Sequence, residues 1–148
     1  MIDLIVIILS TQMLFAYDSA GAQVFQVPVA VGQAHHSTPV ADTYIEQVVV
    51  FPWWHPTFGS KEGIPPRHKE NAMGVAKVMM KDMGNIRIHS ADQISTSLNG
   101  PRYMSSGCVR LRHEDMIELV HRIQGEVDWS KTDQWLTPNR RVRVKIRD

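Results

Sequence analysis

The sequence has only one cysteine, Cys108, among its 148 residues. One cysteine excludes an internal disulfide and any metal site built from several cysteines of the same chain. The formal net charge is only +1, so no overall field favours nucleic acid or an anionic membrane as a partner. No apolar run approaches the roughly 20 residues of a membrane-spanning helix, and nothing in the composition indicates disorder. The length suits one domain, residues 1–148, with a real hydrophobic core.

An apolar segment near the N-terminus has two interpretations. Residues 4–9 resemble the core of a signal peptide, and residues 20–22 resemble a cleavage site. However, the preceding residues carry Asp3 and no lysine or arginine, whereas the start of a secretory signal is positively charged. We therefore favour a buried strand of the mature domain, and we expect any export signal to lie outside this chain.

Short apolar or alternating segments favour β-structure along most of the chain. Strands are expected at residues 4–9, 12–17, 23–31, 45–51, 75–80 and 85–89. Residues 140–147 alternate arginine and lysine with Val142, Val144 and Ile146, which predicts a strand with a basic, solvated face at a sheet edge. Residues 52–71 and 91–103 are expected to be long loops, which often surround functional sites.

One helix is predicted after the cysteine. Four apolar residues there share one helical face through their spacing of i, i+3, i+4 and i+7: Met116, Leu119, Val120 and Ile123. Acidic residues open this segment, basic residues close it, and Gly125 follows as a stop. The fold class is therefore mainly β, with one substantial helix. We expect no special role for His113 and His121 of the helix, and we expect Trp129 and Trp135 to pack in the core.

The surroundings of Cys108 suit a nucleophile. A cysteine thiol is mostly protonated at neutral pH, so it needs a base or a positive neighbour. His89, at the end of a predicted strand, titrates in the right range to serve as that base. Gly107 allows close backbone approach, and its N–H and that of Cys108 are candidates for an oxyanion hole. Arg110 shares the side of Cys108 in an extended segment and could bind a carboxylate.

These features alone leave two interpretations open. An isolated cysteine is more often a small buried apolar residue than a nucleophile. An isolated histidine after a strand is more often structural than catalytic. Local chemistry therefore favours neither a catalytic nor a structural role for the pair.

Longer motifs resemble the catalytic domain of L,D-transpeptidases of the YkuD type. The resemblance rests first on His89-Ser90 and on the run Ser105-Ser106-Gly107-Cys108-Val109-Arg110. This run is closest to the Gram-negative branch of the family, and many other members have histidine where this chain has Ser106. Further similar blocks lie at residues 29–32, 38–40, 52–57, 64–66 and 71–74. The resemblance implies a β-sandwich-like L,D-transpeptidase catalytic domain with the helix after the nucleophile.

The resemblance also implies a mechanism and a substrate. Cys108 would be the nucleophile and His89 its base, with the Ser90 carbonyl orienting the imidazole and Gly107 and Ser106 contributing to the oxyanion site. The substrates would be peptidoglycan stem peptides, with a tetrapeptide donor and a diaminopimelate acceptor joined in a 3→3 crosslink. Our candidates for substrate binding are Arg110, Ser105, Arg102 and Trp54, with surface solvation as the equal alternative for Arg102. Carbapenems are expected as covalent inhibitors, the periplasm or cell envelope as the location, and no cofactor is needed.

Three alternatives accompany this prediction. Water as acceptor would make the protein a peptidoglycan L,D-carboxypeptidase or endopeptidase with the same Cys-His site. The chain could instead be an inactive peptidoglycan-binding module. A metal site at His35, His36 and His55 is disfavoured because their spacing matches no compact ligand motif. Trp53 and Trp54 suit either substrate stacking or packing at the rim of the domain.

Overall fold

The computed structural model describes residues 1–32, 37–55, 62–92, 94 and 107–148. This part of the chain forms nine strands and one helix. In chain order these are β1 (Ile2–Ile8), β2 (Met13–Asp18), β3 (Gln23–Pro28), β4 (Ala41–Val50), β5 (Ala76–Met80), β6 (Arg87–Ala91), β7 (Val109–Arg112), α1 (His113–Gln124), β8 (Gln134–Leu136) and β9 (Arg143–Arg147). The prediction of a mainly β domain with one helix after Cys108 is confirmed.

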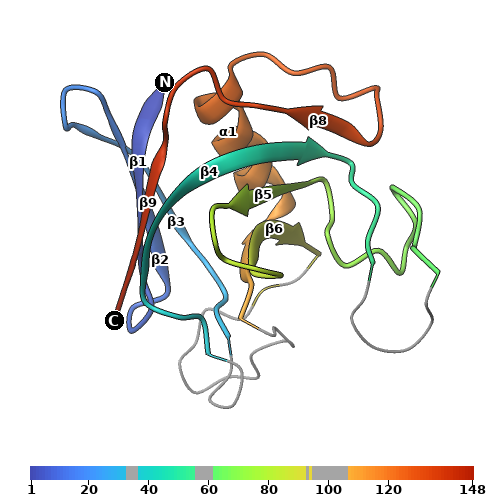
Figure 1. Ribbon diagram of the computed structural model, residues 1–148, viewed down its shortest axis with the longest axis horizontal. Coiled ribbons are helices and arrows are strands. Elements are labelled where there is room, and N and C mark those ends of the chain that lie inside the picture. The colour runs from blue at the N-terminus through green and yellow to red at the C-terminus, as the bar shows by residue number, and fades with distance from the viewer. Residues whose placement is uncertain (33–36, 56–61, 93, 95–106) are drawn as a thin grey trace.

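The strands form one strongly curved sheet in the order β3-β2-β1-β9-β4-β5-β6-β7, with β8 paired to β4. The long strand β4 joins the two halves, because its first residues pair with β9 and its later residues pair with β5 (Figure 1). The far ends of the sheet also meet. Ala30, just after β3, exchanges two backbone hydrogen bonds of 2.9 Å with Arg110 of β7. The sheet therefore closes on itself beside Cys108.

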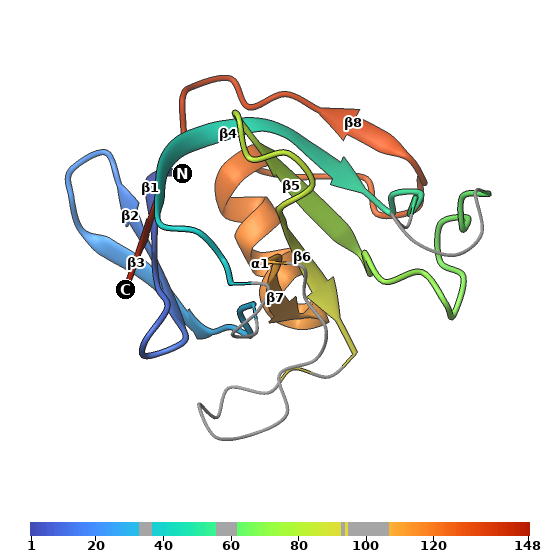
Figure 2. The same cartoon turned by 60° about the horizontal axis from the view of Figure 1, so that its bottom comes forward.

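Helix α1 lies between the two halves of this sheet (Figure 1, Figure 2). Its four predicted apolar residues are all fully buried: Met116, Leu119, Val120 and Ile123. Gly125 ends the helix with a φ of 78° and donates its N–H to the His121 carbonyl at 2.8 Å. A left-handed residue in this place suits glycine, because a side chain there would be strained. No helix of the described residues is long and apolar enough to cross a membrane.

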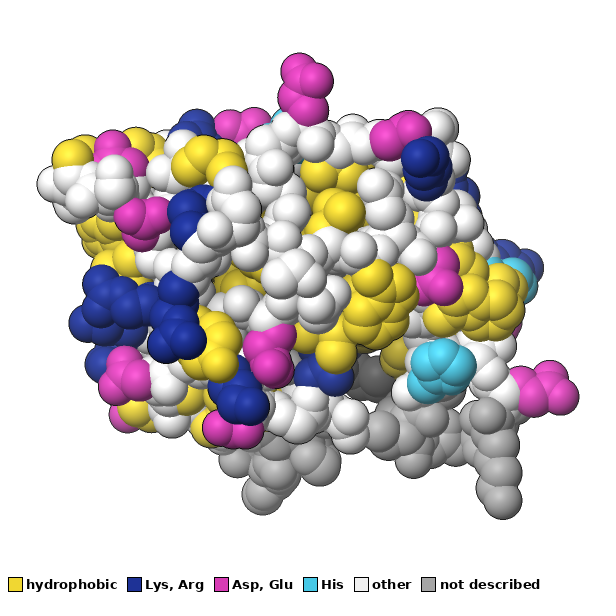
Figure 3. All heavy atoms as spheres, turned by 45° about the horizontal axis from the view of Figure 1, so that its top comes forward, with side chains coloured by type: hydrophobic (Ala, Val, Ile, Leu, Met, Phe, Trp, Pro, Cys, Tyr) yellow, Lys and Arg dark blue, Asp and Glu magenta, His cyan; other side chains and the backbone are white. Residues whose placement is uncertain are grey.

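The prediction for the C-terminal strand is wrong in one respect. β9 is an interior strand, parallel to β1 and antiparallel to β4, and not a solvated edge. Val142, Val144 and Ile146 are fully buried as the alternation predicted. Alternation reports which face is buried but carries no information on strand neighbours, so the local pattern could not exclude an interior position. Figure 3 shows basic side chains gathered at the left of the molecule, where the outer face of β9 lies.

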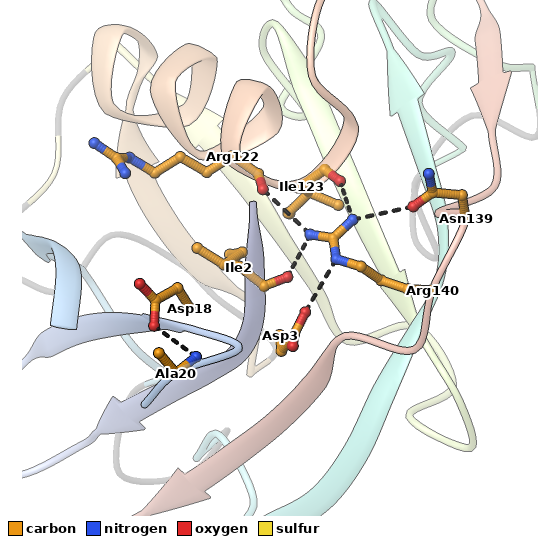
Figure 4. Close-up of polar contacts among 8 residues, drawn as sticks. All are labelled: Ile2, Asp3, Asp18, Ala20, Arg122, Ile123, Asn139 and Arg140. Atoms are coloured by element: carbon orange, nitrogen blue, oxygen red, sulfur yellow. Dashed lines mark hydrogen bonds and ion pairs between the residues drawn. The ribbon is translucent and has the colours of Figure 1, made fainter. Parts of the chain in front are cut away.

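Arg140, which precedes β9, connects three parts of the chain. Its guanidinium forms an ion pair with Asp3 at 3.1 Å and donates to the Ile123 carbonyl at 2.8 Å (Figure 4). It also donates to the carbonyls of Ile2 and Arg122. The last carbonyls of a helix have no partner within the helix and carry partial negative charge. Arg140 therefore caps α1 and fastens it to β1.

The four tryptophans divide between core and surface. Trp129 packs against the core and meets Phe51 edge to face, with ring centroids 6.0 Å apart. Trp135 of β8 is 53 % exposed, so the prediction that it packs in the core is wrong. β8 pairs with β4 on one side, and the Trp135 ring faces Lys77 at 5.5 Å instead. A three-residue strand offers too little alternation to predict which face is buried.

Candidate active site

The site is built on three neighbouring strands, β5, β6 and β7. His89 of β6 lies opposite Lys77 of β5 and opposite Arg110 of β7. Residues that lie opposite one another in a sheet project to the same face. The other face of β6 and β7 carries Ile88 and Val109, which are fully buried in the core. The polar residues therefore share the face that points away from the core.

Cys108 directly precedes β7 and lies beside the start of β6. Its Sγ accepts a hydrogen bond from the Arg87 N–H at 3.4 Å and lies 3.5 Å from the Asn85 carbonyl oxygen. Extending the parallel register by two residues places Cys108 opposite Arg87. With neighbouring strands about 4.8 Å apart and about 3.3 Å per residue, the Cα atoms of Cys108 and His89 are about 8 Å apart. Two side chains on one face can bridge that separation.

The His89 ring is fully buried, and its hydrogen bonds define its tautomer. Nδ1 lies 3.0 Å from the Ser90 carbonyl oxygen, which can only accept, so Nδ1 carries the proton. Nε2 is buried and has no hydrogen-bond partner within the described part of the chain. In this tautomer Nε2 is the basic nitrogen. The ring is therefore set to accept a proton at Nε2.

Burial shifts both titratable groups toward their neutral forms. It lowers the pKa of His89 to about 4, aided by the positive charges of Arg110 and Lys77 and opposed by the Ser90 and Ala72 carbonyls. Burial also raises the pKa of the Cys108 thiol, while the Arg87 N–H and the guanidinium groups of Arg110 and Arg87 act in the opposite direction. The resting pair is thus a neutral thiol and a neutral imidazole, with positive charges around them.

Thr38 holds Gly107, the residue before Cys108. Its hydroxyl donates to the Gly107 carbonyl at 2.7 Å and accepts the Gly32 N–H at 2.9 Å. Gly107 has a φ of 105°, and a Cβ there would lie 3.1 Å from the Ile86 side chain and 3.3 Å from the Ser37 carbonyl. Only glycine fits that conformation without strain. Thr38 therefore ties the segment after β3 to the turn that carries Cys108.

Ser90 is fixed from several sides. Its buried hydroxyl accepts the Val75 N–H at 2.8 Å and lies 2.8 Å from His113 Nδ1. The other ring nitrogen of His113 lies 2.7 Å from an Asp92 carboxylate oxygen. The expectation that His113 has no special role did not include this contact with Ser90. His113 is the first residue of α1, and the strand-to-helix junction after Cys108 brings it to Ser90, a contact that helical periodicity does not reveal.

A cavity of about 520 Å³ lies beside this network. The cavity is lined by Phe51, by residues 67–72 and 74–75, by residues 90–92, and by Arg110 and His113. The Arg67 guanidinium lies 3.9 Å from the centre of the Phe51 ring and donates to the Trp129 carbonyl at 2.8 Å. Two arginines, Arg67 and Arg110, are thus among the residues around the cavity.

The remaining predicted site residues fall into two groups. Ser105, Ser106 and Arg102 lie outside the described residues. Trp54 is half-buried and forms a two-way backbone bridge with Ile64, on the segment that leads into the cavity lining.

The predicted absence of a metal site concerns three histidines. His35 and His36 lie outside the described residues, and His55 stacks on Trp53 with ring centroids 6.5 Å apart. Within the described ranges no three histidine, cysteine or acidic side chains gather closely enough to hold a metal ion.

Four residues of this site were missed at the level of sequence. Arg87 could have been found, because it lies two residues before His89 and alternation places both on one face. Lys77 depends on the β5–β6 register, which no local signal gives. Thr38 and His113 depend on contacts across 69 and 23 residues of sequence.

A family-model match and a set of similar solved structures both relate this chain to L,D-transpeptidases. The family model of the L,D-transpeptidase catalytic domain, YkuD, matches residues 2–144. Similar solved structures include the Ldtfm–avibactam carbamoyl enzyme (TM-score 0.69, 18 % identity, covering 100 % of this chain and 49 % of that one). A second is a cysteine-to-serine mutant of the Enterococcus faecium L,D-transpeptidase (TM-score 0.64, 17 % identity, covering 99 % of this chain and 50 % of that one). A third is an L,D-transpeptidase from Mycobacterium tuberculosis (TM-score 0.61, 15 % identity, covering 98 % of this chain and 57 % of that one).

The matches cover nearly all of this chain but a smaller share of the matched chains. This chain spans about half the length of the first structures it matches. It covers 95 % of the separately solved catalytic domain from Enterococcus faecium, with a TM-score of 0.63 and 15 % identity. No curated protein sequence matches the chain significantly. At these identities the structural matches establish a shared fold.

Proposed function

Because this chain belongs to the L,D-transpeptidase catalytic-domain (YkuD) family, we propose that it forms 3→3 peptidoglycan crosslinks through a thioester on Cys108. The observation that carries the proposal is the parallel pairing of β6 and β7. It sets Cys108 and His89 on one face, with Nε2 of His89 buried and unpaired among the described residues. A buried basic nitrogen beside a thiol has the geometry of a nucleophile and its general base.

The first half-reaction removes D-alanine from the donor. Nε2 of His89 takes the Cys108 proton while the sulfur attacks the carbonyl carbon on the L-centre of diaminopimelate. The tetrahedral intermediate collapses when the His89 imidazolium returns the proton to the D-alanine nitrogen. D-Alanine leaves, and a thioester joins Cys108 to the stem.

The second half-reaction releases the stem. The side-chain amine of a second diaminopimelate attacks the thioester, and His89 accepts a proton from that amine. The Cys108 sulfur leaves and is reprotonated, which restores the resting pair. Water in place of the amine would give L,D-carboxypeptidase activity, so the acceptor alone separates the two functions.

The electrostatics support acyl transfer at this cysteine. Negative charge develops on the sulfur and on the carbonyl oxygen during attack, and the sulfur lies near Arg87 and Arg110. The N–H groups of Gly107 and Cys108 are our candidates for the oxyanion donors, and one such donor is typically worth about 2.7–4 kcal/mol. Arg110 also lines the cavity and is our candidate for binding a stem carboxylate. Since peptidoglycan lies outside the cytoplasm, the proposal places the reaction in the periplasm or cell envelope.

Muropeptide analysis tests the proposal directly. The protein is incubated with purified tetrapeptide stems, and the products are separated and weighed. Crosslinked dimers are the expected result. Tripeptide without dimer would show hydrolysis and would replace transfer with L,D-carboxypeptidase activity.

Acylation by a β-lactam tests the nucleophile separately from the acceptor. Solved relatives include an L,D-transpeptidase in complex with imipenem and another with a faropenem-derived adduct. We expect imipenem to add its mass to this protein at Cys108 and to leave Cys108→Ala unmodified. Modification of Cys108→Ala would refute the assignment, and an unreactive wild-type protein would favour a binding module.

His89→Ala should lower acylation by orders of magnitude with the fold intact, because the thiol would lose its base. Circular dichroism checks the fold, and an unchanged rate would refute the role of His89.

A further inference from the structure

The exposed pair His113–Asp92 lies outside the Cys-His pair but is connected to it through one residue. Ser90 Oγ lies 2.8 Å from His113 Nδ1, and Ser90 O lies 3.0 Å from His89 Nδ1. Ser90 is thus the only residue between the two imidazole rings in this chain of hydrogen bonds. Any displacement of Ser90 moves the group that defines the tautomer of His89.

The donors and acceptors in this chain are set by the groups at its ends. The Asp92 carboxylate accepts from His113 Nε2, so Nδ1 of the neutral ring is an acceptor. The Ser90 hydroxyl then donates to Nδ1 and accepts the Val75 N–H at 2.8 Å. Both functions of that hydroxyl are used, which fixes the Ser90 rotamer.

The composition Ser90, His113 and Asp92 is that of a hydrolase triad, but the arrangement does not suit a second nucleophile. Ser90 is fully buried, and its oxygen is occupied by the Val75 N–H. Gly74 packs so tightly that a Cβ there would lie 2.2 Å from Ser90 Oγ and 2.7 Å from Ser90 O. No substrate carbonyl can approach an oxygen enclosed in this way. The three residues therefore act on Ser90 as a support.

We propose that His113, held by Asp92, is a positioning residue that fixes Ser90 and through its carbonyl keeps His89 in the tautomer that is basic at Nε2. This inference rests on the proposed function for its effect on rate, but its effect on the His89 ring does not depend on catalysis. His113 stays about one-third exposed while Ser90 is buried. The support thus extends from the surface to the site.

The first test compares substitutions of His113 by the rate of Cys108 acylation with imipenem, followed by intact-protein mass. His113→Ala should lower the limiting rate about threefold to tenfold, the usual effect of one hydrogen bond, with little change in the half-saturating imipenem concentration. His113→Asn keeps an acceptor near the Nδ1 position and should recover most of the rate. His113→Gln reaches Asp92 instead and should resemble His113→Ala.

The matched control is His121→Ala. His121 lies on the same helix but bonds to the Trp129 indole N–H at 3.0 Å, away from Ser90. Its removal should leave the limiting rate unchanged. A loss equal to that of His113→Ala would overturn the proposal by showing that any histidine of α1 affects the rate through general stability.

A double-mutant cycle tests the route through Ser90. Ser90→Ala keeps the carbonyl that faces His89 but removes the hydroxyl that His113 holds. If His113 acts through that hydroxyl, His113→Ala should add almost nothing in the Ser90→Ala background. Losses that multiply would overturn the proposed route.

Nitrogen-15 NMR of the imidazole rings gives a readout without activity, with His89 assigned from His89→Gln. Wild-type His89 should show a protonated Nδ1, and His113→Ala should show averaging between the two tautomers. A His89 spectrum unaffected by His113→Ala would overturn the inference whether or not imipenem reacts. Failure of wild-type acylation with the expected ring spectra would instead overturn the proposed function and retain the positioning role.

Discussion

The pKa of His89, about 4 against an ordinary value of 6.5, predicts how stability depends on pH. Burial disfavours the imidazolium in the folded chain, whereas the unfolded chain is protonated below pH 6.5. Between these two values the unfolded state binds the extra proton, so the folded state loses stability as pH falls. The full difference is worth about 3 kcal/mol, and most of it should be lost by pH 4.5.

Urea denaturation at pH 7 and pH 4.5 measures this effect, with His89→Gln as the control. Glutamine is neutral at both pH values and can still donate to the Ser90 carbonyl. Carboxylates titrate in both proteins, so the difference between the two pH-dependent losses isolates His89. We expect the wild-type free energy of unfolding to fall by roughly 2–3 kcal/mol more than that of the variant.

The same measurement distinguishes two resting states of the site. A thiolate–imidazolium pair would raise the pKa of His89, and acidification would then stabilise the wild type relative to His89→Gln. Equal losses in the two proteins, or a relative gain by the wild type, would refute the neutral pair. The pH profile of imipenem acylation gives a second check, because a neutral base predicts an acid limb near pH 4.

Three further substitutions probe the supports of the site. Gly74→Ala places a Cβ 2.2 Å from Ser90 Oγ, whereas the control Gly84→Ala has a similar φ but open space around the new Cβ. Gly74→Ala should therefore lower the free energy of unfolding by more than about 2 kcal/mol beyond the control, and equal losses in urea denaturation would exclude the clash. Arg140→Ala should cost about 2–4 kcal/mol because several charge-assisted hydrogen bonds are lost, and Arg140→Lys should recover only part; a change under about 0.5 kcal/mol would refute the cap on α1. Thr38→Val should lower the free energy of unfolding by about 1–3 kcal/mol and slow acylation, whereas Thr38→Ser should keep the wild-type stability and rate. Wild-type behaviour of Thr38→Val would show that the hydroxyl linking Gly32 to Gly107 does not hold the turn before Cys108.

Local sequence patterns predicted most of the elements because each has its own signal. The apolar stripe of α1 and the alternation in β9 repeat over enough residues to define a face. The first strand also followed from an apolar run without a basic start, and residues 2–8 form β1. Boundaries shifted by a few residues, as at β3, which ends at Pro28 and not at residue 31.

Pairing partners were not predictable in the same way. β9 lies between β1 and β4, and Ala30 closes the sheet on Arg110. These contacts link residues far apart in the sequence, and nothing in the alternation of Val142, Val144 and Ile146 identifies a neighbour. The surface position of Trp135 was missed because β8 has only three residues, too few to show which face is buried.

In the candidate site, too, residues with a local sequence signal were predicted, whereas contacts between distant parts of the chain were not. Chemistry and resemblance identified Cys108 and His89, whose roles remain predictions. Of the positive surroundings, Arg110 was named from the sequence, Arg87 could have been found from its alternation with His89, and Lys77 needs the β5–β6 register. The support at His113 came from the junction of β7 and α1. The reactive groups and their neighbours on the same segments were thus visible in the sequence, whereas the contacts made across strands and at the helix junction were not.

The pKa shifts of Cys108 and His89 determine when the site becomes charged. Burial keeps the proton on the Cys108 sulfur and off Nε2 of His89, so the resting site carries no ion pair that must be desolvated. In the proposed mechanism, negative charge arises only when a carbonyl carbon is attacked, and the guanidinium groups of Arg87 and Arg110 lie close to the attacking sulfur. Interactions that strengthen only in the transition state raise the rate without tightening ground-state binding. In the proposed mechanism, a buried, neutral pair with positive charges around it therefore favours acyl transfer over irreversible oxidation of the thiol, because the reactive thiolate is scarce until a substrate is bound.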